Sequence, residues 1–296
     1  MIRPALTRVP RVAAIHDLSC FGRCALTVIM PTLSVMGLQC VPVPTALFST
    51  HTGGFQNMHF IDLSDSMEGI ADHFESLPLT FDALYSGFLG SARQIGIVSD
   101  FIDRFRGEGN ARAHVLVDPV MGDDGKLYST YTEELQAGMR HLCEKADIIT
   151  PNLTEACFLT GTPWQDTTAM TAAEAEAFAG ELAQKMTAFG ASQIVITGVP
   201  CGESIGTYGL DVAGHAERVF FYRVTRQPKS FPGTGDIFAS VLLGALMRGD
   251  DLFAATRAAA DFVGDVISYS QECGEPTRDG VLLEPMLWKL AKGEIE

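Results

Sequence analysis

Two glycines and an acid precede an apolar segment late in the chain, in the run Pro232-Gly233-Thr234-Gly235-Asp236. Glycines allow the backbone to turn tightly and to approach a ligand closely. If the apolar residues that follow form a helix, the N–H groups of this turn point together at its positive end, where phosphate binds. Asp236 then has two interpretations: it caps the helix, or it is a base beside a phosphoryl group in transfer.

Polar residues directly follow several other apolar segments. Ligands of open α/β sheets lie beyond the carboxyl ends of the strands, so these positions predict one shared crevice. Each residue alone is equally an ordinary turn or cap residue, but together they favour a site built of oxygen ligands. They are His16 and Asp17, the run 118–123, Thr150 and Asn152 with Glu155, and Thr197 with Gly198.

Two common phosphate-binding motifs are absent from the sequence. The single Gly-Lys pair, Gly125-Lys126, is followed by Leu127, so there is no P-loop. The late glycine turn has Phe238 where a dinucleotide-binding fingerprint needs its third glycine, and it does not follow the first strand. The seven cysteines contain no C-x-x-C pair, which indicates neither a zinc site nor a disulfide framework.

The elements that must position these residues alternate along the chain. Short Val- and Ile-rich runs predict strands, and the segments between them have helical period. After residue 198 the pattern changes to an antiparallel hairpin and then to a helical tail with turns at 249–250 and 275–276. We therefore predict one domain over residues 1–296, an α/β fold with a mostly parallel sheet covered by helices on both faces. The predicted strands are 12–15, 40–44, 83–86, 115–118, 148–150 and 194–197, with the hairpin at 204–210 and 218–224; the predicted helices are 22–36 (kinked or broken at Pro31), 64–77, 92–105, 133–145, 154–160, 172–189 and 238–247.

Acidic residues outnumber basic ones, 36 against 21, for a formal net charge of −15. Such a field repels nucleic acid and anionic lipid, so we expect neither as a partner. The apolar runs are too short to span a membrane, and the first ten residues contain no apolar core of a signal peptide, which favours a cytoplasmic protein. Several acids converge on the predicted crevice, which could not hold a phosphate-bearing ligand without a cation such as Mg²⁺.

Four further motifs make the sequence resemble the ribokinase superfamily and, within it, the pyridoxal kinase family. They are 48–53 (FSTHTG), 86–91 (SGFLGS), 118–123 (DPVMGD) and 148–155 (IITPNLTE), and the likeness runs from Val12 to about Gly264. The resemblance implies a ribokinase-like three-layer α/β/α sandwich. It also implies a homodimer that uses ATP and Mg²⁺ to phosphorylate the 5′-hydroxymethyl group of vitamin B6 vitamers (pyridoxal, pyridoxamine, pyridoxine) in pyridoxal phosphate salvage. A monovalent cation, K⁺ or Na⁺, is left open.

The same resemblance implies a role for each matched residue. Asp236 is the base that deprotonates the substrate hydroxyl, and Gly233, Thr234 and Gly235 form the anion hole. The implied vitamer-binding residues are Asp17, Thr52, Gly53, Phe88 and Asp236; the ATP-binding residues are Asp118, Thr150, Asn152, Glu155, Thr197, Gly198 and Thr234; the metal-binding residues are Asp118, Asp123 and Glu155.

Asp17 departs from the family pattern, which commonly has Ser at this place, near the ring nitrogen of the substrate. A carboxylate prefers a protonated ring nitrogen or an amino substituent. We therefore hypothesise that pyridoxamine or pyridoxine is used as well as pyridoxal, or better. Phe88 stands where the family often has Tyr, and an aromatic side chain there can cover one face of the pyridine ring.

Three other classes of protein fit these residues less well. Hydroxymethylpyrimidine kinases share the fold, but they tend to carry Cys at the place of Asp236 and a glycine-rich loop after the first strand. Sugar kinases of the superfamily have a lid domain, for which the stretch 37–64 is too short. A non-catalytic vitamer-binding protein would not need the intact glycine turn and the full set of acids.

Overall fold

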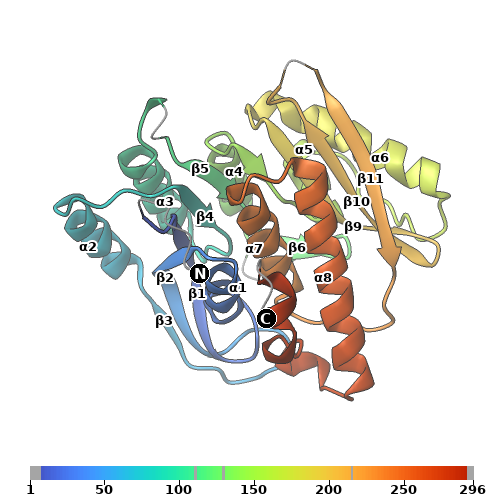
Figure 1. Ribbon diagram of the computed structural model, residues 1–296, viewed down its shortest axis with the longest axis horizontal. Helices are drawn as coiled ribbons and strands as arrows, with labels where there is room; N and C mark the ends of the chain where they lie inside the picture. Colours follow the sequence, from blue (N-terminus) through green and yellow to red (C-terminus); the bar gives the residue numbers. More distant parts are fainter. Residues whose placement is uncertain (1–7, 110–111, 129–130, 215, 292–296) are drawn as a thin grey trace, which may run out of the picture.

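The computed structural model describes residues 8–291, apart from 110–111, 129–130 and 215. In this part of the chain the main sheet has the order β11-β10-β9-β8-β5-β4-β1-β2-β3 (Figure 1). The central strands pair in parallel from β2 to β9, β3 pairs antiparallel with β2, and the β10–β11 hairpin continues antiparallel from β9. The strands are β1 (Arg11–Phe21), β2 (Gln39–Thr50), β3 (Phe60–Asp62), β4 (Ala83–Ser86), β5 (His114–Val117), β8 (Ile148–Ile149), β9 (Gln193–Cys201), β10 (Ser204–Asp211) and β11 (Arg218–Thr225).

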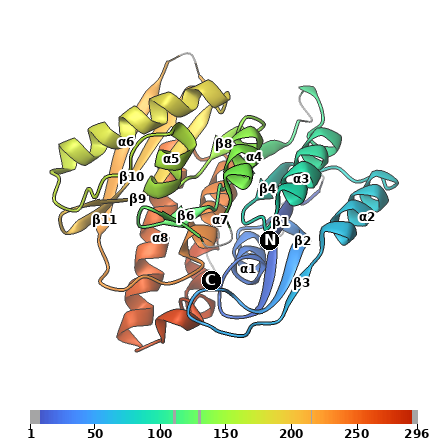
Figure 2. The same ribbon diagram turned by 180° about the vertical axis from the view of Figure 1, so that it is seen from behind.

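Helices cover both faces of this sheet. One layer contains α1 (Leu26–Val35), α7 (Thr234–Met247) and α8 (Leu252–Glu272), seen in front in Figure 1. The view from behind shows the other layer (Figure 2). It consists of α2 (Ser64–Glu75), α3 (Ala92–Phe105), α4 (Glu133–Cys143), α5 (Leu153–Thr160) and α6 (Ala172–Met186).

Alternation along the buried strands explains the two layers. In β1, Val12 and Ala14 belong to the core beneath α1, α7 and α8, whereas Ala13 and Ile15 belong to the core beneath the other helices. Successive strand side chains point to opposite faces, so a strand apolar at every position can be buried only between two helical layers. The prediction of a three-layer α/β/α sandwich with a mostly parallel sheet is confirmed.

Side-chain caps set the starts of five helices in the described chain. Each cap accepts a hydrogen bond from an N–H group in the first turn, which satisfies a donor that the helix itself cannot pair. The caps are Ser91, Thr132, Asn152, Thr171 and Asp251. The predicted helices in these regions are confirmed.

Strands β1 and β2 extend further than the predicted 12–15 and 40–44. Beyond a register shift at Asp17, β1 continues to pair with β2 as far as Phe21 and Thr50, and β3 adds to this extension. The prediction of a helix from residue 22 is therefore wrong at its start: α1 begins at Leu26, with Pro31 inside it. The pairing partners of 18–21 lie almost thirty residues away, and no local periodicity reveals them.

Smaller features complete the described chain. The predicted hairpin after residue 198 is confirmed as β10 and β11. A short hairpin of β6 (Gly122–Asp123) and β7 (Lys126–Leu127) was not predicted. Short 3₁₀ helices lie at Thr187–Phe189, Thr277–Asp279 and Glu284–Leu290. None of the helices described here is long and apolar enough to cross a membrane.

Candidate active site

The start of α7 is an open anion-binding turn. Gly233 is its N-cap residue with φ 80°, and no side chain of the described residues caps this end. A Cβ at Gly233 would overlap the carbonyl oxygen of Arg23, so only glycine fits both the conformation and the space. The first-turn N–H groups, those of Thr234 and Gly235 among them, are therefore free to face an anion at the positive end of the helix.

Asp236 is held by a residue far away in the sequence. Its Oδ2 accepts a hydrogen bond of 2.8 Å from the backbone N–H of Ala25, which has φ 48° at the start of α1. Because this carboxylate does not bond to the N–H groups of its own helix, the interpretation of Asp236 as a helix cap is wrong. Burial, with a smaller contribution from the charge of Asp17, raises the pKa of Asp236 to about 7, which suits a base at neutral pH.

Four carboxylates converge at the carboxyl edge of the sheet. Burial raises the pKa of Asp17 to about 6 and that of Glu155 to about 8. Burial and the charges of Glu155 and Asp236 raise the pKa of Asp118 well above its usual range. No Lys or Arg in the described chain forms an ion pair with any of the four, and the basic side chain near Asp236 in this part of the chain is His16, with Nδ1 3.9 Å from Oδ1. Such a cluster fits a site whose charge is balanced by a bound cation.

Glu155 and Asn152 form a reciprocal cap at the start of α5. Glu155 Oε2 accepts the N–H of Asn152 at 2.8 Å and Asn152 Oδ1 accepts the N–H of Glu155 at 2.9 Å. The pair also holds the neighbouring loop, because Glu155 Oε1 accepts the N–H of Met121 and Asn152 Nδ2 donates to the oxygen of Gly122. Asn followed by Glu three residues later is the capping-box pattern, a signal the sequence contained.

The ends of β5 and β8 and the middle of β9 bring the remaining predicted nucleotide residues together. Thr150 follows β8, and its N–H donates to the oxygen of Val117, next to Asp118. Its buried hydroxyl faces the Asp118 carboxylate and favours the charged form of that group. Thr197 forms a parallel bridge with Asn152, and Gly198 has φ 65° directly after it.

The four remaining predicted residues lie in loops and in the β6–β7 hairpin. Thr52 and Gly53 occupy an exposed turn after β2, where the Gly53 N–H donates to His51 Nδ1 at 3.0 Å. Phe88 is half-buried after β4, and Asp123 is exposed in the β6–β7 hairpin. In the part of the chain that the structure describes, no hydrogen bond or ion pair joins any of the four to Asp236.

The predicted metal ligands Asp118, Asp123 and Glu155 do not come together as a preformed set. Among the described residues, no three His, Cys, Asp or Glu side chains are arranged to hold a metal ion. The reason lies in Glu155, whose two oxygens accept backbone N–H groups of Asn152 and Met121. What remains is Asp118, a buried carboxylate without a cationic partner, which fits a Mg²⁺ ion that also binds phosphate oxygens and water.

Sequence reasoning missed the support behind Asp236. The loop before α1 is fixed from the far end of the chain: the Arg23 N–H donates to the oxygen of Asp279, and its guanidinium pairs with Glu275 and Glu284. His51 Nε2 is 2.6 Å from the oxygen of Arg278 in the same segment. These partners are more than 220 residues apart, so no local pattern could reveal them.

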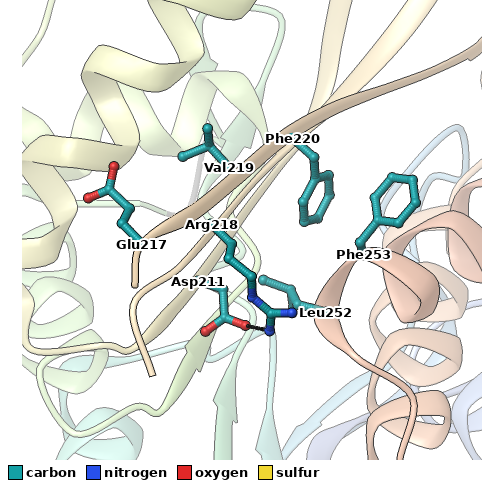
Figure 3. A pocket seen from close by; sticks show the side chains of 7 residues that line it. All are labelled: Asp211, Glu217, Arg218, Val219, Phe220, Leu252 and Phe253. Carbon is teal, nitrogen blue, oxygen red and sulfur yellow. Dashed lines mark hydrogen bonds and ion pairs between the residues drawn. The ribbon is translucent and has the colours of Figure 1, made fainter. Parts of the chain in front are cut away.

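A separate hollow of about 540 Å³ lies between β11 and the start of α8 (Figure 3). Arg218 points into it and is paired with Asp211 and Asp251. Asp211 is paired in the sheet with Gln193, at the amino end of β9. The hollow therefore lies at the amino ends of the parallel strands, whereas the candidate site lies at their carboxyl ends. None of the predicted site residues lines it.

Comparison with known proteins agrees with this geometry. The model of the family Phosphomethylpyrimidine kinase matches residues 14–279. A candidate phosphomethylpyrimidine kinase from Bacteroides thetaiotaomicron, crystallised with pyridoxal, is 39% identical with a TM-score of 0.86 and covers 98% of each chain. The pyridoxal kinase from Lactobacillus plantarum is 30% identical with a TM-score of 0.84, covering 96% of this chain and 97% of its own. A pyridoxine/pyridoxal/pyridoxamine kinase from Bordetella avium is 29% identical over 94% of this chain and 93% of its own.

The fold and the site define a kinase of the ribokinase-like class. The chain belongs to the phosphomethylpyrimidine kinase family, and within it to the pyridoxal kinases. The resemblance inferred from the four motifs and the glycine turn is thereby confirmed, as is the prediction of an enzyme.

Proposed function

We propose that this protein transfers the γ-phosphoryl group of ATP to the 5′-hydroxymethyl group of vitamin B6 vitamers in pyridoxal phosphate salvage. The observation that carries the proposal is the uncapped start of α7 with Asp236 in its first turn, facing three further buried carboxylates. The Bacteroides thetaiotaomicron relative crystallised with pyridoxal supports the substrate class. Donor and acceptor would meet where the N–H groups of α7 and Asp236 face the same point.

In this proposal the residues of the chain act by position and charge. Asp236 accepts the proton of the hydroxyl through Oδ1, while Oδ2 stays bonded to Ala25. Gly233, Thr234 and Gly235 direct N–H groups at the phosphoryl oxygens, whose negative charge grows in the transition state. Thr150, Asn152, Thr197 and Gly198 would line the nucleotide path, and Thr52, Gly53 and Phe88 the vitamer pocket.

Asp118 would hold a Mg²⁺ ion together with phosphates, with Asp123 and Glu155 nearby. The ion supplies charge neutralisation between the acids and the nucleotide. A monovalent cation, K⁺ or Na⁺, a single domain over residues 1–296, a homodimer and a cytoplasmic location belong to the proposal as well.

A substrate panel tests the function. Purified protein with ATP and Mg²⁺ is offered pyridoxal, pyridoxamine, pyridoxine and hydroxymethylpyrimidine, and the phosphorylated products are measured. We expect the three vitamers to be phosphorylated with higher kcat/KM than hydroxymethylpyrimidine, which the family description keeps as the second candidate. A preference for the pyrimidine, or binding of vitamers without turnover, would contradict the proposal.

Asp17 should influence the order of the three vitamers. Its carboxylate is 7% exposed, accepts a hydrogen bond of 3.0 Å from Ser19, and has a pKa raised by burial to about 6. It is therefore poised to pair with a protonated nitrogen on the ligand. In Asp17→Ser we expect kcat/KM for pyridoxamine and pyridoxine to fall relative to pyridoxal, by about 10-fold for one lost charge-assisted contact. An unchanged order would show that Asp17 does not contact the vitamer.

A further inference from the structure

The imidazole of His16 is buried at the centre of the site without a hydrogen-bond partner. It is 0% exposed, and neither ring nitrogen has a partner among the described residues. Buried polar groups are nearly always paired, because an unpaired one destabilises the fold. A histidine retained in this state beside an active centre is expected to serve the reaction rather than the core.

Its surroundings fix the orientation of the ring. The ring of Tyr85 meets it edge-on, with centroids 4.3 Å apart and an interplanar angle of 71°. A Cβ at Gly87 would overlap the imidazole at Cε1 and Nδ1, so only glycine leaves room for the ring. Burial lowers the pKa of His16 to about 3, so the ring is neutral at physiological pH and has one N–H donor.

The ring nitrogen Nδ1 faces the base. It lies 3.9 Å from Asp236 Oδ1, about 1 Å longer than a hydrogen bond. We propose that His16 is a positioning residue for Asp236: with substrate bound, its Nδ1–H donates to Oδ1 and, with the Ala25 N–H on Oδ2, fixes the carboxylate against the reacting hydroxyl. Each carboxylate oxygen has two acceptor sites, so Oδ1 can accept this bond and still receive the hydroxyl proton.

The distance is compatible with such a role. Catalytic hydrogen bonds are often long in ligand-free enzymes and shorten in the reacting complex. A displacement of about 1 Å at the reacting group is enough to change a rate by about 100-fold. The inference rests on the proposed function, because it takes Asp236 as the base.

Two variants of His16 separate positioning from packing. His16→Phe keeps the ring volume and removes both unpaired nitrogens; we expect Tm to stay or rise, while kcat falls about 10–100-fold and the KM for vitamer and ATP changes little. His16→Asn leaves a cavity but keeps an N–H group near the place of Nδ1. We expect it to have the lower Tm of the two and the higher kcat. If His16 served only packing, both variants would have a lower Tm than the wild type, and neither would lose kcat per folded enzyme.

Thr256→Val is the matched control. Thr256 is also fully buried in α8, its hydroxyl has no hydrogen-bond partner among the described residues, and it has no part in the site. Its change should leave both kcat and KM as in the wild type. If His16→Phe retains the wild-type kcat, or if His16→Asn is the slower variant, the inference about His16 is overturned. A wild type that phosphorylates none of the panel substrates would instead overturn the proposed function.

Discussion

Asp236→Asn should abolish most of the kinase activity while leaving the fold and nucleotide binding intact. The asparagine oxygen can still accept the N–H of Ala25, which now lies 2.8 Å from Oδ2, so the loop before α1 keeps its anchor. The amide cannot take the hydroxyl proton. Loss of a general base costs about 10²–10⁴-fold in rate, and we expect kcat for the vitamers to fall within this range.

Steady-state kinetics and calorimetric titration of ATP measure the two halves of this prediction. Asp251→Asn is a matched control, because Asp251 caps α8 with the same kind of bond, and asparagine caps a helix equally well. It should leave kcat unchanged. If Asp236→Asn retains the wild-type turnover, Asp236 is not the general base, whichever substrate the enzyme uses.

The pH dependence of the wild type provides a second measurement on the same group. Only the ionised carboxylate accepts a proton, and burial raises the pKa of Asp236 to about 7 in the free protein. The kcat/KM value reports the free enzyme, so it should increase with pH until this group is ionised and then level off. In Asp236→Asn the residual rate should lack this increase.

The sequence predicted the parts of the site whose signals are local. The turn at Gly233 could be predicted because glycines at the start of a helix indicate a positive φ and close contact of the backbone with a neighbouring group. The structure has φ 80° at Gly233. The carboxyl ends of the strands could be predicted to lie at one edge of the sheet, because continuous apolar runs predict buried parallel strands. Asp118 and Thr150 followed from that topology alone.

What the sequence could not predict depends on contacts between distant segments. The bond from Ala25 to Asp236 joins residues 211 positions apart, and Ala25 gives no sign of its left-handed conformation. The extension of β1 exists because β2 pairs with it, not because residues 16–21 alternate in polarity. The family resemblance assigned Glu155 to the metal; in the structure it forms a capping box with Asn152 at the start of α5.

The other large effect is expected at Asp118. Asp118→Asn removes the charge of a buried acid whose pKa is raised by burial and by the charges of Glu155 and Asp236. Without Mg²⁺ or nucleotide, the variant should therefore be more stable than the wild type, with a higher Tm. A carboxyl whose pKa is higher in the folded than in the unfolded state binds its proton more tightly when folded, so this group destabilises the fold as pH rises through that interval. The pKa of Asp118 is raised well above its usual range, so the advantage of the variant should increase as pH rises above the usual pKa of an aspartate.

Addition of Mg²⁺ should reverse the order of the two proteins. If Asp118 holds the ion, Mg²⁺ with a non-hydrolysable ATP analogue stabilises the wild type by mass action and stabilises Asp118→Asn much less. The kcat of the variant should fall about 10–100-fold or more, as expected when a ligand that orients a catalytic cation is lost. Asp251→Asn again serves as the control, and we expect Mg²⁺ to raise its Tm as much as it raises that of the wild type. An equal Mg²⁺-dependent rise in Tm for wild type and Asp118→Asn would show that the cation binds elsewhere, and that the acids around Asp236 are balanced by protons rather than by metal.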